Sequence, residues 1–293
     1  MKYERLLLLM LTCLTTGTNA EETIPVDGIG HVAFEVVDLE KSQAFYTKHY
    51  GFLFAFSVDE GPEARYLKIN DDQFLKLVGK PEGTDDDRLV EVAFEVSDLE
   101  ATVTLLRARG LNPGPVRRRA DGTLASVLSD PEGHRLVFVE YVDGSEQVLA
   151  RGKHLGANRV SERLWHVGLT ISDEAVANAF YRDKLGFEEV WRASRTDGGP
   201  DAWVNMQIPG ERGDYIEYIL LNGTTPDRQR LGTMHHVCYM IDDIGEAHAH
   251  LLCNGLADLK KYEPRIGRNQ RWLLNVHDPD GTRSELMENR LAD

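Results

Sequence analysis

A short strand-like phrase recurs four times along the chain, and this repeat constrains the fold more than any other feature of the sequence. In each copy a polar side chain stands at the start of, or just inside, an apolar run with the composition of a buried β-strand. The four polar residues are His31, Glu91, His166 and His236. His31 and Gly51 are 20 residues apart (51 − 31), as are His166 and Gly186 (186 − 166). A fixed internal period predicts four copies of one supersecondary unit.

The first copy predicts a β-α-β-β-β module. A strand over residues 26–36 precedes a helical pattern over residues 39–50, which Gly51 ends. Three strand-like runs then follow, at residues 53–56, 64–69 and 73–78.

The modules pair along the chain, first with second and third with fourth. The tight turn that closes the second module at residues 130–133 returns at residues 278–281 in the fourth. Residues 142–161 lose all periodicity, so the boundary between two domains is predicted there. We therefore expect an α+β fold of two domains, each of paired βαβββ modules that form a curved mixed sheet around a cleft. The expected segments are an N-terminal domain over residues 26–143, a linker over residues 144–163 and a C-terminal domain over residues 164–290.

The first 20 residues have the layout of a cleavable signal peptide. Lys2 and Arg5 precede an apolar run over residues 6–14, and small residues lead to Ala20. The apolar run is shorter than the roughly 20 residues that span a bilayer, although an uncleaved anchor is the alternative. The sequence therefore predicts a secreted or periplasmic protein without a stable membrane span after leader removal.

Net charge and cysteine content limit the classes of binding partner and the disulfides that can be expected. A net charge of −15 and a pI near 5.1 would repel a nucleic-acid backbone, so no nucleic acid is expected. A small-molecule substrate is expected instead, with the chain acting as a monomer or homodimer. Removal of the leader leaves Cys238 and Cys253, which predict no disulfide framework and fit small buried hydrophobic positions.

Strand parity predicts one polar cluster in the C-terminal domain. Alternate side chains of a strand share a face, so His166 and Gly168 point to one side and Val167 to the other. We expect the module's own helix to cover the aliphatic face, while the histidine face lines the inside of the curved sheet. If the modules correspond, four side chains converge there: His166, Glu217, His236 and Glu285. Two imidazoles and two carboxylates suit one divalent first-row metal ion.

These motifs resemble the vicinal oxygen chelate superfamily, which includes glyoxalase I, methylmalonyl-CoA epimerase, fosfomycin-resistance proteins and extradiol dioxygenases. The phrases that carry the resemblance are His166-Val167-Gly168-Leu169, Phe180-Tyr181, Leu185-Gly186-Phe187, Ile216-Glu217-Tyr218, His235-His236-Val237 and the run from Asp278 to Leu286. The resemblance covers both halves of the mature chain and implies the paired βαβββ fold with a metal cleft. The His/Glu/His/Glu set is most similar to the glyoxalase I branch, whereas extradiol dioxygenases use His/His/Glu and have no metal-binding carboxylate at the position of Glu217.

The N-terminal domain departs from this pattern. Its corresponding positions hold His31, Lys76, Glu91 and Val137. A charged lysine and a valine cannot ligate a metal, so this domain is expected to be a degenerate, metal-free copy.

Several readings of the site compete. A strand histidine is commonly a satisfied core residue, and a strand glutamate such as Glu217 commonly faces solvent. His235 lies on the opposite strand face and is expected to be structural, and Glu288, a rival to Glu285, is expected at the surface. Further substrate-binding candidates near the cleft are Trp203, Asn205, Asn269 and Arg271.

The leading functional hypothesis is a metal-dependent lyase or isomerase that acts on a small molecule with vicinal oxygens. The ion (Ni, Co, Zn, Mn or Fe(II)) would act as a Lewis acid and stabilise an enediolate-type intermediate, while Glu285 or Glu217 moves the proton. The runner-up is a ring-cleaving dioxygenase with Fe(II) on His166, His236 and Glu285. A non-catalytic small-molecule binding or sequestering protein is the third reading.

Overall fold

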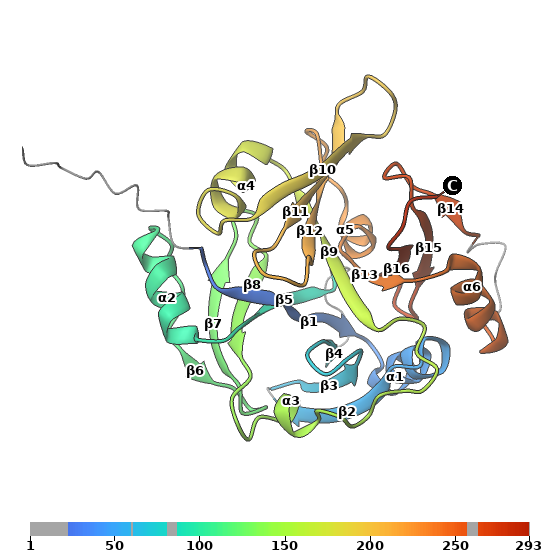
Figure 1. The fold of residues 1–293 in the computed structure, drawn as a ribbon, viewed down its shortest axis with the longest axis horizontal. Coiled ribbons are helices and arrows are strands. Elements are labelled where there is room, and N and C mark those ends of the chain that lie inside the picture. Colours follow the sequence, from blue (N-terminus) through green and yellow to red (C-terminus); the bar gives the residue numbers. More distant parts are fainter. Residues whose placement is uncertain (1–22, 60, 81–86, 257–262, 293) are drawn as a thin grey trace, which may run out of the picture.

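Two curled mixed sheets of eight strands form the frame of the protein (Figure 1). The computed structural model describes residues 23–59, 61–80, 87–256 and 263–292. The signal-peptide prediction lies outside these residues. The α+β fold of paired βαβββ modules is confirmed.

Each sheet is built from two consecutive modules. The first sheet has the order β2 (Leu53–Asp59), β3 (Glu63–Lys68), β4 (Phe74–Gly79), β1 (Val26–Val36), β5 (Leu89–Val96), β8 (Arg135–Glu140), β7 (Leu124–Ser129) and β6 (Arg117–Arg118). The second repeats it as β10 (Glu188–Ser194), β11 (Asp201–Gln207), β12 (Tyr215–Leu220), β9 (Arg163–Ile171), β13 (His236–Ile241), β16 (Arg283–Glu288), β15 (Trp272–His277) and β14 (Arg265–Ile266). In both, the opening strands of the two modules pair antiparallel at the centre.

The helix after each opening strand starts at an aspartate. Asp38, Asp98, Asp173 and Asp243 each accept a hydrogen bond from the backbone N–H three residues later. Such N-caps satisfy donors that the first helical turn leaves unpaired. The helices are α1 (Leu39–Phe45), continued by a π-helical turn (Tyr46–Tyr50), then α2 (Leu99–Ala108), α4 (Glu174–Tyr181) and α6 (Ile244–Cys253). None of the helices in the described segments is long and apolar enough to cross a membrane.

Two short helices lie between the repeated elements. Helix α5 (Arg228–Met234) leads directly into β13, and helix α3 (Glu146–Leu149) lies within the segment expected to be a linker. Gln147 of α3 donates a hydrogen bond to Asp121, and Lys68 donates to the carbonyl of Ala150. This segment therefore packs on the concave side of the first sheet.

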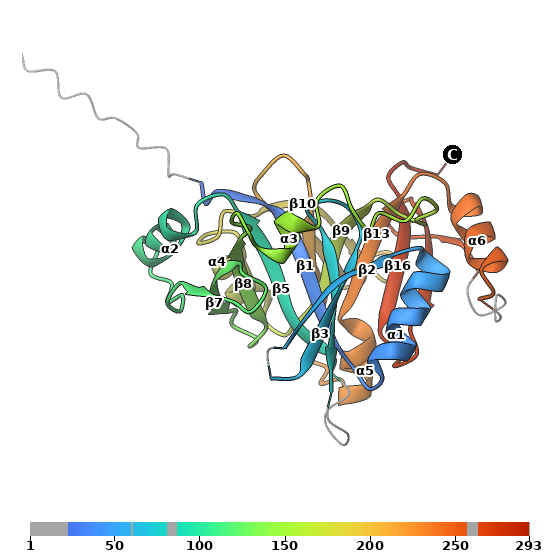
Figure 2. The same cartoon turned by 90° about the horizontal axis from the view of Figure 1, so that it is seen from below.

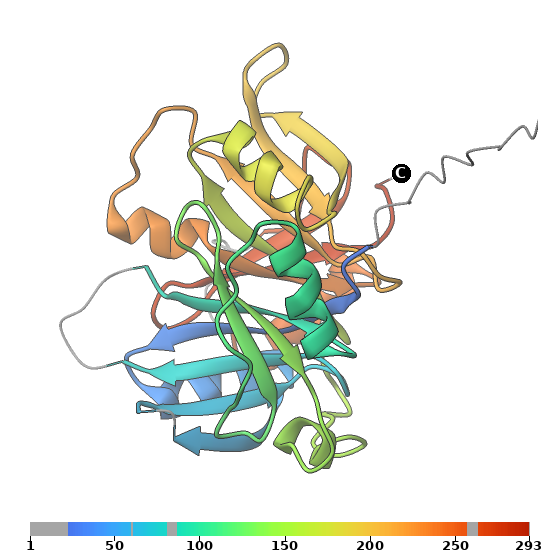
Figure 3. The same ribbon diagram turned by 90° about the vertical axis from the view of Figure 1, so that its left-hand side faces the viewer.

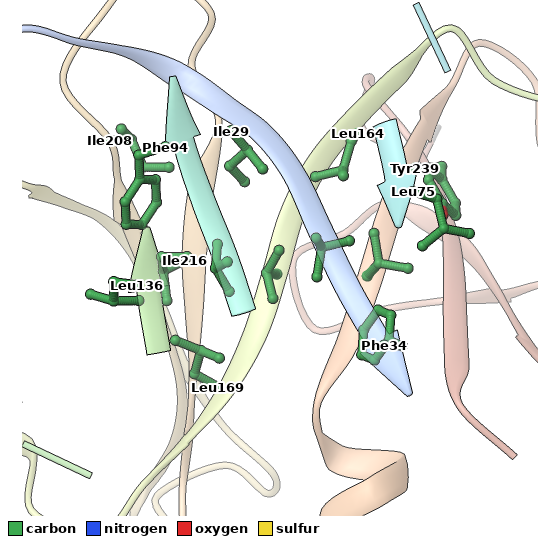
Figure 4. Packing of buried hydrophobic residues seen from close by; sticks show 14 of the residues in the cluster. Ile29, Phe34, Leu75, Phe94, Leu136, Leu164, Leu169, Ile208, Ile216 and Tyr239 are labelled. Carbon is green, nitrogen blue, oxygen red and sulfur yellow. The ribbon is translucent and has the colours of Figure 1, made fainter. Parts of the chain in front are cut away.

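The aliphatic faces of the two sheets pack against each other, which sequence reasoning did not predict. Ile29 and Phe34 of β1 contact the same core as Leu164 and Leu169 of β9 (Figure 4). In Figure 3 the blue and cyan strands of the first sheet accordingly lie below the yellow strands of the second.

The helices also reach across to the other sheet. The rings of Tyr50 and Phe52 lie 5.8 Å and 5.0 Å from that of Tyr239 on β13, and α1 lies beside β16 and α6 in Figure 2. Conversely, Tyr181 of α4 donates a hydrogen bond to Asp130 beside the first sheet. The expectation that each module's own helix covers its aliphatic face was therefore wrong in part, because a twisted sheet leaves room for the helix of the neighbouring domain.

Candidate metal centre

Four adjacent strands of the second sheet bring the predicted cluster into one row. The order β12-β9-β13-β16 places Glu217 opposite Gly168, and Gly168 opposite His236. Cys238 stands opposite both His166 and Glu285. Because neighbouring strands are about 4.8 Å apart, side chains on one face of this row meet.

The four side chains converge as the parity of the strands predicted. The Nε2 atoms of His166 and His236 are 3.2 Å apart. Glu217 Oε2 lies 3.5 Å from Nε2 of His236, and Glu285 Oε1 lies 3.9 Å from Nε2 of His166. Both imidazoles are fully buried, Glu285 is 6% exposed and the side chain of Glu217 is 13% exposed, so the histidines are shielded from bulk water while the two acids lie at its edge. His166, Glu217 and His236 offer ligand atoms that all lie within 4.8 Å of one another.

Burial shifts the titration of each group toward its neutral form. Burial first, and then the nearby charge of Glu285, raise the pKa of Glu217 to about 8, while Arg283 opposes the shift. Burial likewise raises the pKa of Glu285. The pKa values of His166 and His236 lie well below their usual range, first because of burial and then because of Arg283. Desolvated lone pairs that face one another are stabilised by a cation between them.

The chemistry of these donors fits a divalent metal ion. Neutral imidazole nitrogen and carboxylate oxygen are borderline and hard ligands, a mixture that suits first-row divalent ions. The Nδ1 atom of His236 lies 2.8 Å from the carbonyl oxygen of Met234. If Nδ1 donates its proton there, the lone pair of Nε2 is available to a metal, as second-partner hydrogen bonds commonly arrange.

Arg283 competes for that same nitrogen. Its Nη2 atom lies 2.6 Å from Nδ1 of His236, and a guanidinium group can only donate. The nitrogen cannot accept from Arg283 and donate to Met234 at once. In the tautomer that leaves Nε2 unprotonated, Nδ1 donates to Met234 and cannot accept from Arg283, which also lines the cavity.

Sequence reasoning missed two residues next to the cluster. Cys238, expected to be a small hydrophobic residue, brings its Sγ atom within 4.8 Å of ligand atoms of His166 and Glu285. The ring of Tyr215 lies tilted by 31° against that of His166, with centroids 4.5 Å apart. The signal for Cys238 was its position two residues after His236, which puts both on one strand face.

A cavity of about 800 Å³ opens above the cluster. Glu217 and Glu285 lie in its wall together with Trp203 and Asn269, two of the four predicted substrate-binding residues. Five arginines also line it, namely Arg195, Arg230, Arg265, Arg268 and Arg283. Arg195 stacks on the ring of Trp203 at 4.8 Å, and Arg268 pairs with Asp197 at 2.6 Å.

The other two predicted substrate residues lie beside this cavity. Asn205 is buried and stands opposite Glu217 on β11. The guanidinium of Arg271 lies 5.3 Å from the ring of Trp165 and donates to the carbonyl of Glu288. Among the described residues, neither is part of the cavity wall.

His235 and Glu288 have structural partners. His235 contacts Asp87 (2.8 Å), Thr170 (2.9 Å) and His134 (3.2 Å) on the side away from the cluster. The predicted surface position of Glu288 was wrong, because this residue is 2% exposed. Its carboxylate accepts the N–H of Ile244 at the start of α6, as Glu140 accepts that of Leu99 at α2.

The equivalent row of the first sheet holds an ion-pair cluster instead. Lys76 and Glu91 both stand opposite Ala33, and Val137 stands opposite Ala93. The ammonium group of Lys76 lies 3.2 Å from Oε1 of Glu91, and Nε2 of His31 lies 3.0 Å from the same oxygen. The ammonium group of Lys76 thus supplies the positive charge next to the carboxylate of Glu91. The chemistry of these four side chains does not fit a metal.

Comparisons with known proteins identify the family of the chain. Residues 28–138 and 163–286 match the Glyoxalase/Bleomycin resistance protein/Dioxygenase superfamily. An ethylmalonyl-CoA/methylmalonyl-CoA epimerase of Cereibacter sphaeroides is 29% identical over 126 residues, which cover 40% of this chain and 90% of that protein.

Solved structures share the fold. The 2,3-dioxygenase LapB of Pseudomonas sp. KL28 superposes with a TM-score of 0.64 at 17% identity, covering 92% of this chain and 94% of that one. The Mn(II)-bound glyoxalase of Novosphingobium aromaticivorans superposes with a TM-score of 0.64 at 16% identity, covering 92% and 84%.

Proposed function

The chain belongs to the Glyoxalase/Bleomycin resistance protein/Dioxygenase superfamily, and from this premise we propose that it is a metal-dependent enzyme of the lyase or isomerase type. The proposed substrate is a small molecule with two neighbouring oxygen atoms and an anionic group. The observation that carries the proposal is the meeting of two imidazoles and two carboxylates at the floor of an arginine-lined cavity.

The proposed ligands of one divalent ion (Ni, Co, Zn, Mn or Fe(II)) are His166, Glu217, His236 and Glu285. Two carboxylates and two neutral imidazoles offset the charge of such an ion, which makes their burial tolerable. When bound, the ion supplies Lewis acidity toward the two neighbouring oxygens of a substrate.

Either carboxylate is a candidate to move the proton between adjacent carbons. Glu217 and Glu285 both face the cavity, so a substrate carbon above the cluster lies within reach of each. Burial raises the pKa of both groups, which favours proton exchange near neutral pH. These are the proposed catalytic residues.

The arginines support an anionic substrate. Arg283 lies at the level of His236, while Arg265 and Arg268 lie farther along the wall. A guanidinium group binds a carboxylate or phosphate through two parallel hydrogen bonds, which also fixes orientation. A substrate held by Arg283 would present its remaining oxygens to the cluster.

Ring cleavage by a dioxygenase is the second candidate. His166, His236 and Glu285 alone can form a two-histidine, one-carboxylate set for Fe(II). This reading leaves Glu217, whose side chain is 13% exposed, outside the ligand set. The solved dioxygenase structures share the fold of this chain but not the sequence, so they do not decide between the two.

Exchange of a carbon-bound hydrogen of a probe molecule with solvent distinguishes the candidate functions. We expect metal-loaded protein to incorporate deuterium from D₂O into 2-oxobutyrate, a carboxylate with vicinal oxygens, and Glu285→Gln and Glu217→Gln to lose this exchange. Oxygen uptake on addition of a catechol would support the dioxygenase instead. Stoichiometric binding without exchange or oxygen uptake would support a sequestering protein.

Export stays part of the proposal. The leader-like layout of residues 1–20 supports a secreted or periplasmic protein. Loss of these residues from the mature chain, measured by intact mass after expression, is the corresponding test.

A further inference from the structure

The first sheet carries its own cavity, on the opposite side of the molecule from the metal cluster. This cavity of about 530 Å³ lies against β6, β7 and β8. In Figure 1 strands β6 and β14, which border the two cavities, lie at opposite sides. We propose that the first-sheet cavity is a second, metal-independent site that binds a small organic anion with a carboxylate or phosphate group.

The lining is cationic with an apolar floor. Four arginines line the cavity, namely Arg117, Arg118, Arg119 and Arg135. Among the described residues of the wall there is no acid, and Pro115, Ala125 and Val127 supply apolar contact. The whole chain carries a net charge of −15, so a wall of four arginines is a strong local departure. Such a cleft focuses its field and raises the local concentration of anions.

A buried ion-pair cluster holds two of these arginines in place. Arg119 Nη1 lies 2.9 Å from Oε1 of Glu91, and Arg135 Nε lies 3.1 Å from Oε2. Lys76 contacts the same carboxylate at 3.2 Å. Burial alone would raise the pKa of Glu91, but the hydrogen bond to His31 and the nearby cations hold it well below its usual range. These contacts fix the guanidinium groups of Arg119 and Arg135 at the cavity wall.

The two cavities have arginines at equivalent positions of their sheets, although only the second sheet has the candidate metal ligands. In the first sheet Arg117 stands opposite Ala125, and in the second Arg265 stands opposite Leu273 at the equivalent position. Arg135 is likewise the first residue of β8, and Arg283 is the first residue of β16, the equivalent strand of the second sheet. Val137, by contrast, stands where the second sheet has Glu285. The cationic wall is thus retained where the cluster cannot hold a metal.

The ligand class follows from this lining. Arg117 and Arg118 are exposed and belong to the wall, where a guanidinium group can bind one oxyanion group through paired hydrogen bonds, and the apolar floor can contact a short hydrocarbon body. No redox or covalent step is implied. The site binds, and the cluster of Lys76, Glu91 and His31 serves as its rigid support.

The test uses phenyl phosphate and benzoate as anionic probes, with neutral benzamide as reference, in calorimetric titrations of the full chain. An Arg265→Ala/Arg268→Ala background weakens anion binding in the other cavity. We expect both anions to bind in this background, benzamide not to bind, and Arg117→Ala/Arg118→Ala to weaken binding by at least about tenfold. The control Arg107→Ala/Arg182→Ala removes the same charge from exposed positions outside the cavity and should leave the affinity unchanged.

Independence from the metal cluster is measured separately. In the same background, His166→Ala/His236→Ala should leave probe binding intact while it removes metal, so failure of the proposed enzyme and failure of this site are distinguishable. Absence of saturable binding would overturn the inference. So would equal affinity in the Arg117→Ala/Arg118→Ala variant and its control, or loss of binding with the two histidines. A preference for benzoate or for phenyl phosphate distinguishes carboxylates from phosphate esters as ligands.

Discussion

Gly168 leaves the space that the imidazole ring of His236 occupies. A Cβ placed on Gly168 would overlap the Cε1 and Nδ1 atoms of that ring. The two residues stand opposite each other on β9 and β13, so the absence of a side chain on one strand admits the ring of the other. This explains physically why a glycine follows His166 by two positions in the repeated phrase.

Gly168→Ala should therefore displace His236 and weaken metal binding. We expect a loss of affinity of about 10- to 100-fold, comparable to removal of an important partner of a ligand, with a destabilisation of about 1–3 kcal/mol from overpacking. Metal titration and urea unfolding measure the two effects. Gly245→Ala, in the first turn of α6 and away from the cluster, is the control for metal affinity and should leave that affinity unchanged. Unchanged metal affinity in Gly168→Ala would refute the placement of His236.

Replacement of Arg283 should affect substrate and spare the metal. Arg283→Met removes the guanidinium beside His236 but keeps an unbranched side chain. We expect KM for an anionic substrate to rise by about tenfold or more, while metal content stays constant. Arg290→Met changes an exposed arginine outside the cavity and serves as control. A variant that lost metal and kept KM would contradict the assigned role.

The pH dependence of stability should reverse when metal is bound. In metal-free protein the pKa of Glu217 is raised from 4.5 to about 8, so the folded state binds more protons than the unfolded state between these values. The contribution of this carboxyl is therefore greatest below about pH 4.5 and is lost as pH rises through about 8. With metal bound, stability should rise with pH instead, because protons compete for the ligands.

Urea unfolding with and without a chelator measures this difference between about pH 6.5 and about pH 9, above the range in which the depressed pKa values of His166 and His236 act in the opposite sense. Glu217→Gln cannot ionise, so it should flatten the metal-free profile. A wild-type metal-free profile identical to that of Glu217→Gln would rule out the buried carboxyl as the cause.

Glu91→Gln should destabilise the first sheet. The substitution removes the acid on which Lys76, Arg119 and Arg135 converge, and Lys76 and Glu91 are both nearly fully buried. Breaking a buried ion pair from one side costs about 3–5 kcal/mol. Denaturant unfolding measures the loss, and Glu188→Gln provides a control at an exposed strand acid, on β10. A change below about 1 kcal/mol, the usual value of a surface pair, would show that the cluster is solvated.

The internal repeat allowed more of the fold to be predicted than any single motif did. Equal spacings from His31 and His166 to the following glycines fixed the module, and parity placed His166, Glu217, His236 and Glu285 on one face. Both inferences depend on local periodicity, which any strand must obey. The four-residue row was therefore predictable before the order of the strands was known.

Contacts between distant segments were not predictable in the same way. Nothing local to Tyr50 indicates that its ring lies against Tyr239, because that contact depends on how two complete sheets pack. Glu288 was assigned to the surface because a strand-end glutamate is commonly solvated, yet the start of α6 supplies a buried N–H for it. Arg283 had no sequence signal, since its proximity to His236 arises from pairing of β13 with β16.

The most direct test of the account is the metal content of the protein. Titration of metal-free chain with Ni, Co, Zn, Mn and Fe(II), the last under anaerobic conditions, should show one tightly bound ion per chain, lost in His166→Ala and His236→Ala and retained in the control His248→Ala. Glu217→Ala should also reduce binding, whereas unchanged content in that variant alone would favour the three-ligand dioxygenase set. Absence of near-stoichiometric binding, or binding that survives removal of both histidines, would contradict the metal centre and the enzyme built on it.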